Sequence, residues 1–280
     1  MIKTAVILTV YNRKKVTLHG LRSLYRAITV LGEGYAFDIF MTDDGCTDGT
    51  GEAVANEFPE IKIIKGDGNL YWSGGMRKAW QAAIDSGISY DYYLWFNDDV
   101  VLYDDALLTM FDDLIINIED AIVAGATQDS QMRMCTYGVR ENNILIEPKG
   151  HAFLCTGSLN GNFVLVSHNV YLSLGSIDTH YHHAGGDYDY GFRALKNRIP
   201  VYLAKKYVGI CDQHNKIEKW CDPSVSFIER WKSLRKPNGM PLGVLYYLES
   251  THYGKIQAIY HVITTFLHCC FPAIWSKIKK

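Results

Sequence analysis

The sequence predicts an α/β fold in which a mostly parallel, twisted sheet is flanked by helices. In roughly the first hundred residues, four short apolar runs typical of buried strands alternate with three segments whose apolar residues recur at helical spacing. This alternation indicates a parallel sheet, because the connection between two parallel strands usually crosses over through a helix. Polar clusters follow three of the four runs, at the edge where ligands bind in such sheets.

Apolar periodicity and helix-capping residues predict the individual elements. In the first half we expect strands at 5–10, 37–41, 61–65 and 92–96, and helices at 16–28, from a cap at Thr47 or Asp48 through Phe58, and at 76–86. In the second half we expect helices at 106–117, 168–174 and 188–197, strands at 121–126, 161–167, 200–204 and 207–212, and short strands and turns across 132–147. The expected organisation is a domain over 1–215, with halves 1–100 and 101–215, and a helical extension over 216–280 that is more basic.

Composition narrows the class of protein. The chain has 280 residues, 48% of them hydrophobic, and its formal net charge of -2 gives no sign of general nucleic-acid binding. Its seven cysteines are an odd number without a C-x-x-C pair, which argues against a disulfide framework and a zinc ribbon and favours a reducing compartment. No signal peptide is recognisable at the N-terminus, so we expect a cytoplasmic protein.

Two adjacent carboxylates, Asp98 and Asp99, follow the buried run at 92–96, with Asn97 before them. Such neighbouring charges repel each other at the end of a buried strand unless a cation lies between them. Hard oxygen ligands suit Mg²⁺ or Mn²⁺, the ions that usually accompany phosphate. The alternative is a solvated turn in which one Asp caps the next helix.

Polar residues also follow the first two strands. Asp43 and Asp44 precede Gly45 and can accept hydrogen bonds from a base or a ribose hydroxyl, although Asp-Gly is also a common turn pair. The cluster after the first strand consists of Thr9, Tyr11 and Asn12. In a parallel sheet these clusters and Asn97-Asp98-Asp99 would share one edge, which favours a ligand site there.

The glycine-rich stretch 66–78 precedes the third helix. Gly74 and Gly75 would let the backbone approach a ligand, the helix N-terminus favours an anion, and Arg77 can neutralise a diphosphate. The alternative is a flexible loop with a solvated basic pair. Trp72 can stack on a ligand or fill the core. Neither a dinucleotide fingerprint nor a P-loop is present.

Three further residues carry possible chemistry in the second half. Asp187 follows two glycines at a helix start, where it can serve as a general base or as a plain N-cap. His214 lies just past the last strand, where it can ligate the same metal or be structural. His183 belongs to a loose histidine cluster that either lines an acceptor site or forms a wet loop.

Four motifs, in order, give the chain a resemblance to family 2 glycosyltransferases, the inverting enzymes with the GT-A fold. They are Thr9-Val10-Tyr11-Asn12, the stretch 42–50 (similar to DDGSTDGT), Asn97-Asp98-Asp99 (similar to the D-x-D metal motif, in its N-x-D form) and the stretch 186–193 (similar to EDxDLGxR). The stretch 69–76 resembles a subgroup of rhamnosyl- or galactosyltransferase-like enzymes. The chain departs from the family pattern at Cys46 for Ser, Asn97 for Asp and Gly186 for Glu.

The resemblance implies a role for each candidate residue. Asp187 would be the catalytic base, Asp99 the main metal ligand with His214 in support, and Asp189 and His183 would contact the acceptor. The implied nucleotide-sugar contacts are Thr9, Tyr11, Asn12, Asp43, Asp44, Trp72, Gly74, Gly75, Arg77, Asn97 and Asp98. Gly186 removes a carboxylate that often orients the acceptor, and Asn97 leaves Asp99 with less help in holding Mn²⁺ or Mg²⁺.

The implied function is a metal-dependent inverting hexosyltransferase. It would move a sugar from a UDP- or dTDP-sugar to a glycan or polyprenyl-linked acceptor in bacterial surface polysaccharide biosynthesis, such as that of O-antigen or capsule. A sugar-1-phosphate nucleotidyltransferase is the first alternative, but residues 9–15 lack the glycine-rich basic loop it requires. The second alternative is a non-catalytic sugar-nucleotide-binding protein.

The tail from Gly254 has apolar residues at steps of three to four and ends in three lysines within four residues. We expect an amphipathic helix, kinked at Pro272, that lies on the inner face of the plasma membrane. The alternative is a helix packed on the domain or in a homo-oligomer interface. Three polar residues argue against a spanning helix, namely Gln257, His261 and His268.

Overall fold

The computed structural model describes residues 1–117, 120–142, 144–213 and 217–274. The chain divides into two compact units. The first comprises Met1–Ile177 and Asp187–Gln213, and the second comprises Asp178–Gly186 and the described part of His214–Lys280.

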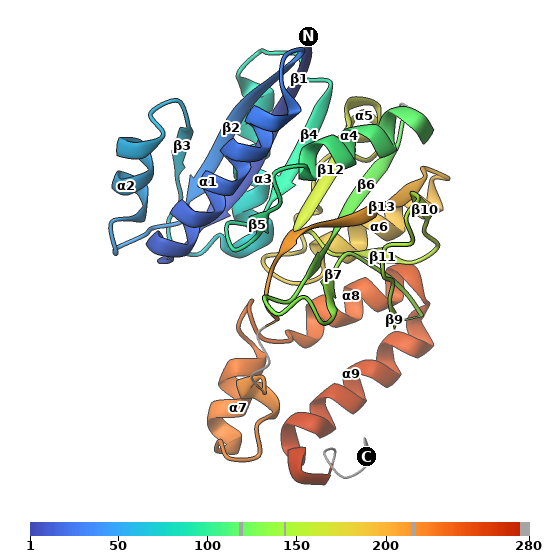
Figure 1. Ribbon diagram of the computed structural model, residues 1–280. Coiled ribbons are helices and arrows are strands. Elements are labelled where there is room, and N and C mark those ends of the chain that lie inside the picture. The colour runs from blue at the N-terminus through green and yellow to red at the C-terminus, as the bar shows by residue number, and fades with distance from the viewer. Residues whose placement is uncertain (118–119, 143, 214–216, 275–280) are drawn as a thin grey trace. The chain divides into compact units, whose positions relative to one another are not determined.

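The first unit is built on a central sheet with strand order β10-β13-β6-β12-β4-β1-β2-β3 (Figure 1). Its strands are β1 (Ile2–Val10), β2 (Tyr35–Asp43), β3 (Lys62–Lys65), β4 (Tyr92–Phe96), β6 (Ile122–Gln128), β10 (Phe153–Leu154), β12 (Phe163–Ser167) and β13 (Val201–Ile210). Strands β3, β2, β1 and β4 run parallel, β12 is antiparallel to both neighbours, and β13 is parallel to β6. The short strands β5 (Val101–Leu102) and β7 (Cys135–Tyr137) pair with β13 and β6. A small sheet contains β8 (Val139–Glu141), β9 (Ile144–Leu145) and β11 (Ser158–Leu159).

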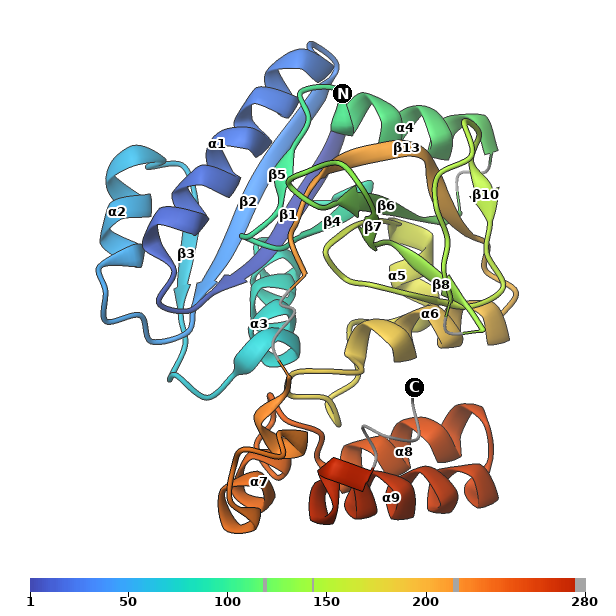
Figure 2. The same ribbon diagram turned by 60° about the horizontal axis from the view of Figure 1, so that its bottom comes forward.

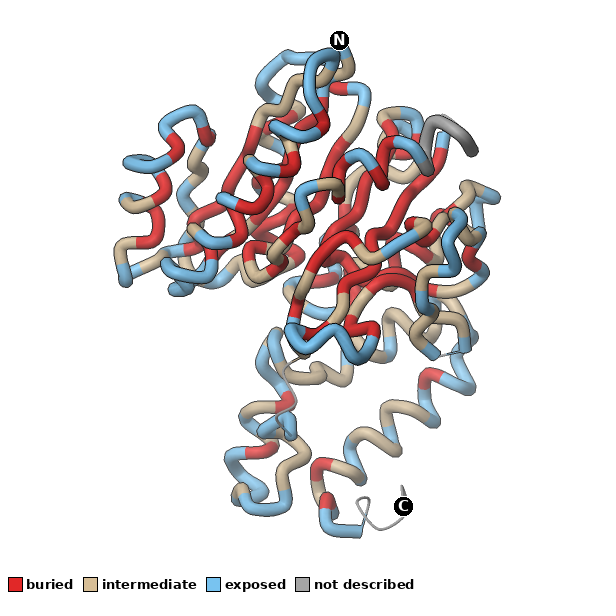
Figure 3. The backbone as a smooth tube through the Cα atoms, viewed as in Figure 1, coloured by how far each residue is buried: buried red, intermediate tan, exposed pale blue. Residues whose placement is uncertain are grey.

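Helices cover both faces of this sheet. On one face lie α1 (Lys14–Leu31), α2 (Thr50–Glu57) and α4 (Ala106–Asn117), and on the other α3 (Tyr71–Asp85), α5 (His168–Leu174) and α6 (Gly186–Lys196). Alternate residues of β1 feed the two cores: Val6 and Leu8 pack with the first helices, and Ala5 and Ile7 with the second. Figure 3 shows the resulting run of buried residues through the sheet. The α/β fold with a mostly parallel, helix-flanked sheet is therefore confirmed.

Several boundaries differ from expectation, and two of the differences change how the chain is read. Helix α3 begins at Tyr71, five residues earlier than expected, so Gly74 and Gly75 are helical rather than part of a loop. The strands expected at 200–204 and 207–212 form a single strand, β13, in which register shifts on either side of Tyr207 accommodate the irregular stretch.

The second unit contains a short 3₁₀ helix, η1 (Lys219–Cys221), followed by α7 (Phe227–Leu234), α8 (Leu242–His252) and α9 (Lys255–Cys270). Helices α8 and α9 lie side by side (Figures 1 and 2). The segment Asp178–Gly186 joins them through α8: the ring of His180 stacks on Tyr247 at 3.8 Å, and the Tyr247 hydroxyl donates to Asp178 at 3.0 Å. The expected C-terminal helices are thus present, and none of the described helices is long and apolar enough to cross a membrane.

Candidate active site

The polar clusters predicted at three strand ends lie at one edge of the sheet. Val10 of β1 pairs with Asp43 of β2, and the Asp44 N–H donates to the Val10 carbonyl at 3.1 Å. Strand β4 ends beside them at Phe96, since β4 pairs with β1 in parallel. This edge is where a parallel sheet presents the ends of its strands to a ligand.

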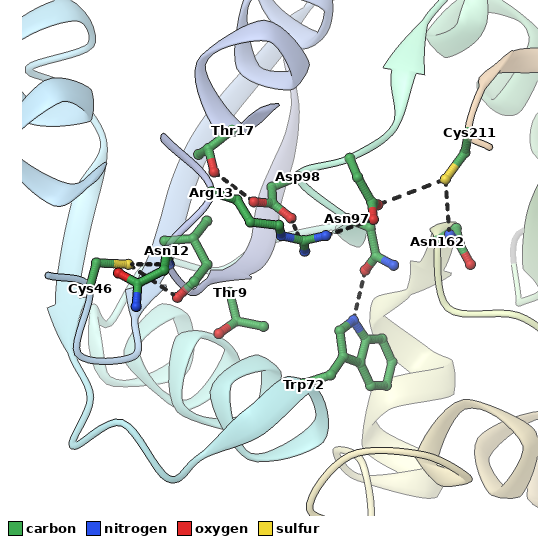
Figure 4. A network of polar contacts seen from close by, with 12 residues as sticks. Thr9, Asn12, Arg13, Thr17, Cys46, Trp72, Asn97, Asp98, Asn162 and Cys211 are labelled. Atoms are coloured by element: carbon green, nitrogen blue, oxygen red, sulfur yellow. Dashed lines mark hydrogen bonds and ion pairs between the residues drawn. The ribbon is translucent and has the colours of Figure 1, made fainter. Parts of the chain in front are cut away.

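Asn12 joins the end of the first strand to the turn after the second. It has a positive φ of 49°, which Asn tolerates better than most residues. Its Oδ1 accepts from the Thr47 N–H at 2.8 Å, and its own N–H donates to Cys46 Sγ at 3.2 Å (Figure 4). The neighbouring Tyr11 is 54% exposed at the same edge. Asn12 thus organises the turn itself, and Cys46 supplies an acceptor where the family usually has a Ser hydroxyl.

Both carboxylates of the Asp43-Asp44 pair are buried and hydrogen-bonded within the protein. Asp43 pairs with Lys65 Nζ at 2.6 Å and accepts from the Cys46 N–H at 2.9 Å. Burial raises the pKa of Asp43, but these hydrogen bonds outweigh it, so the net pKa is lowered. Asp44 accepts the N–H groups of Gly68, Leu70 and Tyr71 at 2.9–3.0 Å. Asp44 is therefore the cap that starts α3 early.

Removing the Asp44 carboxylate should destabilise the fold. In Asp44→Ala, three backbone N–H groups lose their acceptor, and we expect the free energy of unfolding to fall by about 2–3 kcal/mol. Urea denaturation followed by circular dichroism measures this. The matched control is Asp67→Ala, which removes an exposed carboxylate that accepts one N–H, from Asn69. Equal midpoints for the two variants would show that Asp44 does not hold α3.

A guanidinium lies between the adjacent carboxylates that follow β4. Arg13 contacts Asp98 Oδ1 through Nη2 and Asp99 Oδ2 through Nη1, the latter at 2.8 Å. The Asp98 side chain also accepts from Thr17 Oγ1 at 2.6 Å (Figure 4). It is fully buried, whereas the Asp99 side chain is 23% exposed. Burial raises the pKa of Asp98 to about 6, although Arg13 and Thr17 act to lower it. The cation expected between the carboxylates is thus Arg13 in this structure.

Arg13 is not among the predicted site residues. A signal for it exists in the sequence, because it directly follows the polar cluster that ends the first strand. Its partners lie 85 and 86 positions away.

The oxygen ligands at this edge fit a divalent ion that takes one carboxylate from the protein and its other ligands from water or substrate phosphates. Of the two carboxylates that directly follow β4, only that of Asp99 is partly exposed. His214 lies outside the described residues. Among the residues that the structure describes, no three His, Cys, Asp or Glu side chains form a metal cage. Mg²⁺ is usually held through one or two carboxylates together with substrate phosphates, which Asp99 can satisfy.

Trp72 links the carboxylate edge to Asp187. Its Nε1 donates to Asn97 Oδ1 at 2.7 Å (Figure 4), and its ring lies against Gly161, where an added Cβ would be 2.5 Å from two ring carbons. The Gly161 N–H in turn donates to Asp187 Oδ2 at 3.0 Å, and the Tyr188 N–H donates to Oδ1 at 2.9 Å. The structure therefore brings together Asn97, Trp72 and Asp187, through a glycine that is not among the predicted site residues.

The Asp187 carboxyl is suited to accept a proton. Burial raises its pKa, while the N–H groups of Gly161 and Tyr188 act to lower it. A carboxylate with a raised pKa is a stronger base than a solvated one, and its place in the first turn of α6 holds it in one position.

The glycines of α3 serve close packing. Gly75 lies against Thr9, and its carbonyl accepts from the Thr42 hydroxyl at 2.8 Å. An added Cβ at Gly74 would lie 3.3 Å from Leu70 and 3.7 Å from an Arg77 guanidinium nitrogen. Helix α3 can therefore approach the ends of β1 and β2 closely.

Comparison with known proteins shows the family of this chain. Residues 5–165 match the model of the family described as Glycosyl transferase family 2, which is more than half of the chain. The chain belongs to glycosyl transferase family 2. It is therefore a glycosyltransferase. No curated protein sequence matches it.

Solved structures agree on the GT-A fold of this family. The mannosyltransferase PcManGT from Pyrobaculum calidifontis, solved with GDP-Man and Mn²⁺, is 13% identical, with a TM-score of 0.56 over 95% of this chain and 74% of its own. S. aureus TarS is 13% identical, with a TM-score of 0.57 over 97% of this chain. The present chain spans 44% of the TarS length and 72% of TarS 1-349. At this identity the likeness shows the fold alone.

The family resemblance also implied two acceptor contacts, which lie in different units. Asp189 is buried and pairs with Arg193 Nε at 2.7 Å. Arg193 also donates to the carbonyls of Leu174 and Ser176, so this ion pair anchors α6. His183 lies in Asp178–Gly186, within the second unit. Both acceptor roles stay predictions.

Proposed function

We propose that this family 2 enzyme is a metal-dependent, inverting hexosyltransferase. In this proposal it moves a sugar from a UDP- or dTDP-sugar to a glycan or polyprenyl-linked acceptor in the synthesis of a bacterial surface polysaccharide such as O-antigen or capsule. The observation that carries it is the connection from Asp187 through Gly161 and Trp72 to Asn97. This connection supports a single site that contains the candidate base and the strand-end carboxylates. The GDP-Man and Mn²⁺ bound to PcManGT support a nucleotide sugar and a divalent ion.

The proposed reaction is a single displacement. Asp187 takes the proton of an acceptor hydroxyl as its oxygen attacks the anomeric carbon of the donor sugar. The bond from that carbon to the diphosphate oxygen breaks on the opposite face, so the configuration inverts. Arg77 and Arg13 carry positive charge toward the departing diphosphate. A divalent ion held by Asp99 would add charge stabilisation there, and His214 stays a predicted further ligand.

We propose the following division of labour along the chain. Residues 1–100 bind the nucleotide sugar, residues 101–215 position the acceptor, and residues 216–280 form an extension. Asp43 and Asp44 shape the nucleoside end through the turns they hold. The remaining proposed donor contacts are Thr9, Tyr11, Asn12, Trp72, Gly74, Gly75, Asn97 and Asp98.

The extension has the charge expected of a segment that binds an anionic lipid surface. Residues 216–280 carry ten Lys and Arg against four Asp and Glu, a net of +6, and the rest of the chain carries the remaining 18 against 26, a net of −8. Helix α9 also exposes Ile256, Ile259 and Ile263, which are 51–88% exposed and share one face. We propose that α9 brings the enzyme to the inner face of the plasma membrane.

Flotation with liposomes tests this membrane contact. The full chain should float with vesicles that contain anionic lipid, and a variant with Gln at positions 256, 259 and 263 should not. Because all three side chains are exposed, the variant should keep its fold. Equal flotation of the two proteins would reject the membrane role and leave a protein interface as the use of this face.

A donor screen tests the catalytic proposal. UDP-, GDP- and dTDP-sugars are offered with Mn²⁺ or Mg²⁺, and release of the nucleoside diphosphate is measured. We expect release from a UDP- or dTDP-sugar and its loss on chelation. Release of pyrophosphate from a nucleoside triphosphate and a sugar phosphate would instead indicate a nucleotidyltransferase. Binding without turnover would indicate a silent binding protein.

A further inference from the structure

Arg13 serves two carboxylates that differ in their surroundings. The Asp98 side chain is fully buried and takes a second hydrogen bond from Thr17, whereas the Asp99 side chain is 23% exposed. A buried carboxylate without a partner is costly, so the guanidinium is needed at Asp98 whether or not a ligand is bound. Arg13 is itself 40% exposed at the ligand edge of the sheet.

The same guanidinium also pairs with Asp99. One carboxylate oxygen, Oδ2, accepts from Arg13 Nη1 at 2.8 Å. The other, Oδ1, accepts from the thiol of Cys211 at 3.8 Å. A divalent ion that approaches Asp99 in the free protein would therefore meet a carboxylate with one oxygen already held by Arg13 and a fixed positive charge beside it.

We propose that Arg13 is the resident counter-cation of Asp99, which keeps the free enzyme from binding a divalent ion until the donor supplies its diphosphate. The diphosphate changes the balance because it brings negative charge and oxygen ligands to the same place. Arginine has five N–H donors, so Arg13 can keep its bond to Asp98 and still turn toward a phosphate. The inference rests on the proposed metal-dependent transfer and adds an order of binding to it.

Manganese binding without donor or acceptor tests the inference. The signal of free Mn²⁺ in electron paramagnetic resonance falls when the ion binds, which needs no turnover. The wild type should take up no more Mn²⁺ than Asp99→Asn, whereas Arg13→Gln should bind it with an affinity on the order of tenfold higher. Arg22→Gln is the matched control, because it removes an arginine of α1 that pairs with the surface residue Glu57.

Two outcomes overturn the inference. Wild type that binds Mn²⁺ more tightly than Asp99→Asn would show that Arg13 does not block the carboxylate. Arg13→Gln that binds no better than wild type would show that the guanidinium is not the obstacle. If Arg13→Gln fails to fold, a double variant with Asp98→Asn removes the buried charge with its partner and gives the same readout.

A final arm connects the inference to the donor. With the nucleoside diphosphate of the active donor added, wild type should take up Mn²⁺ and Asp99→Asn should not. If wild type takes up the same amount of Mn²⁺ with and without the nucleotide, the inference is also overturned. If the donor screen finds no active donor, the proposed function fails, but the donor-free comparison still judges Arg13 alone.

Discussion

Asp187→Asn should reduce glycosyl transfer by about 10³-fold while donor binding survives. The amide keeps the shape of the side chain and can still accept from the Gly161 N–H, but it no longer takes a proton from the acceptor hydroxyl. Initial rates of transfer and isothermal titration with the nucleoside diphosphate of the donor measure the two quantities separately.

The same residue predicts a pH dependence with a definite sign. A general base must be ionised, so kcat/KM should rise with pH through the pKa of Asp187 and level off above it. Because burial raises that pKa, this limb should lie above the ordinary aspartate pKa of about 4. Asp187→Asn should lack the limb and retain a low rate at every pH.

Asp85→Asn is the matched control for this substitution. Asp85 ends α3, is exposed, and accepts from Gln81 at 2.8 Å, so its loss should leave transfer unchanged. Transfer by Asp187→Asn at the original rate would show that Asp187 is not the base. Loss of donor binding together with transfer would show that Asp187 supports the donor site.

Gly161→Ala should reduce transfer by about 100-fold through displacement of the base. The added Cβ would be 2.5 Å from two ring carbons of Trp72 and 3.2 Å from the Asp187 Cβ, so one or both must move. Overpacking of this kind also costs about 1–3 kcal/mol of stability. Kinetics and urea denaturation follow the two effects, and we expect kcat to fall more than KM rises.

A second substitution can separate crowding from simple destabilisation. Trp72→Leu shortens the side chain that the new methyl group meets, so the double variant with Gly161→Ala should be less impaired than the product of the single effects. Gly243→Ala is the control, since a Cβ there meets no atom within 4 Å. Multiplicative effects in the double variant would mean that Gly161 and Trp72 do not act through each other.

Most of the fold was predictable because the local spacing of apolar residues indicates each strand and helix. The apolar run at 92–96 coincides with β4, and the helices at 106–117 and 168–174 coincide with α4 and α5. The expected end of an element was wrong where a residue far away in the sequence determines it. Helix α3 starts early because Asp44, 26 and 27 positions before Leu70 and Tyr71, accepts their N–H groups.

The sequence predicted which polar side chains lie at the strand ends, but not which residues contact one another there. The polar ends of β1, β2 and β4 were expected at one edge of the sheet and lie there, since parallel strands end on the same side. The predicted cation between Asp98 and Asp99 was expected to be a metal, and the structure has Arg13 there. Gly161 had no signal beyond its place as the first residue of the strand expected at 161–167.

By itself, the sequence determined the alternating α/β pattern, the polar strand ends and the family motifs, because each depends on residues close together in the chain. Only the tertiary structure decided which groups meet: Arg13 with Asp98, Trp72 with Asn97, and Gly161 with Asp187, which lie 85, 25 and 26 positions apart. The physical reason is that strand order and helix packing set these contacts. Neither can be predicted from a local pattern of hydrophobicity.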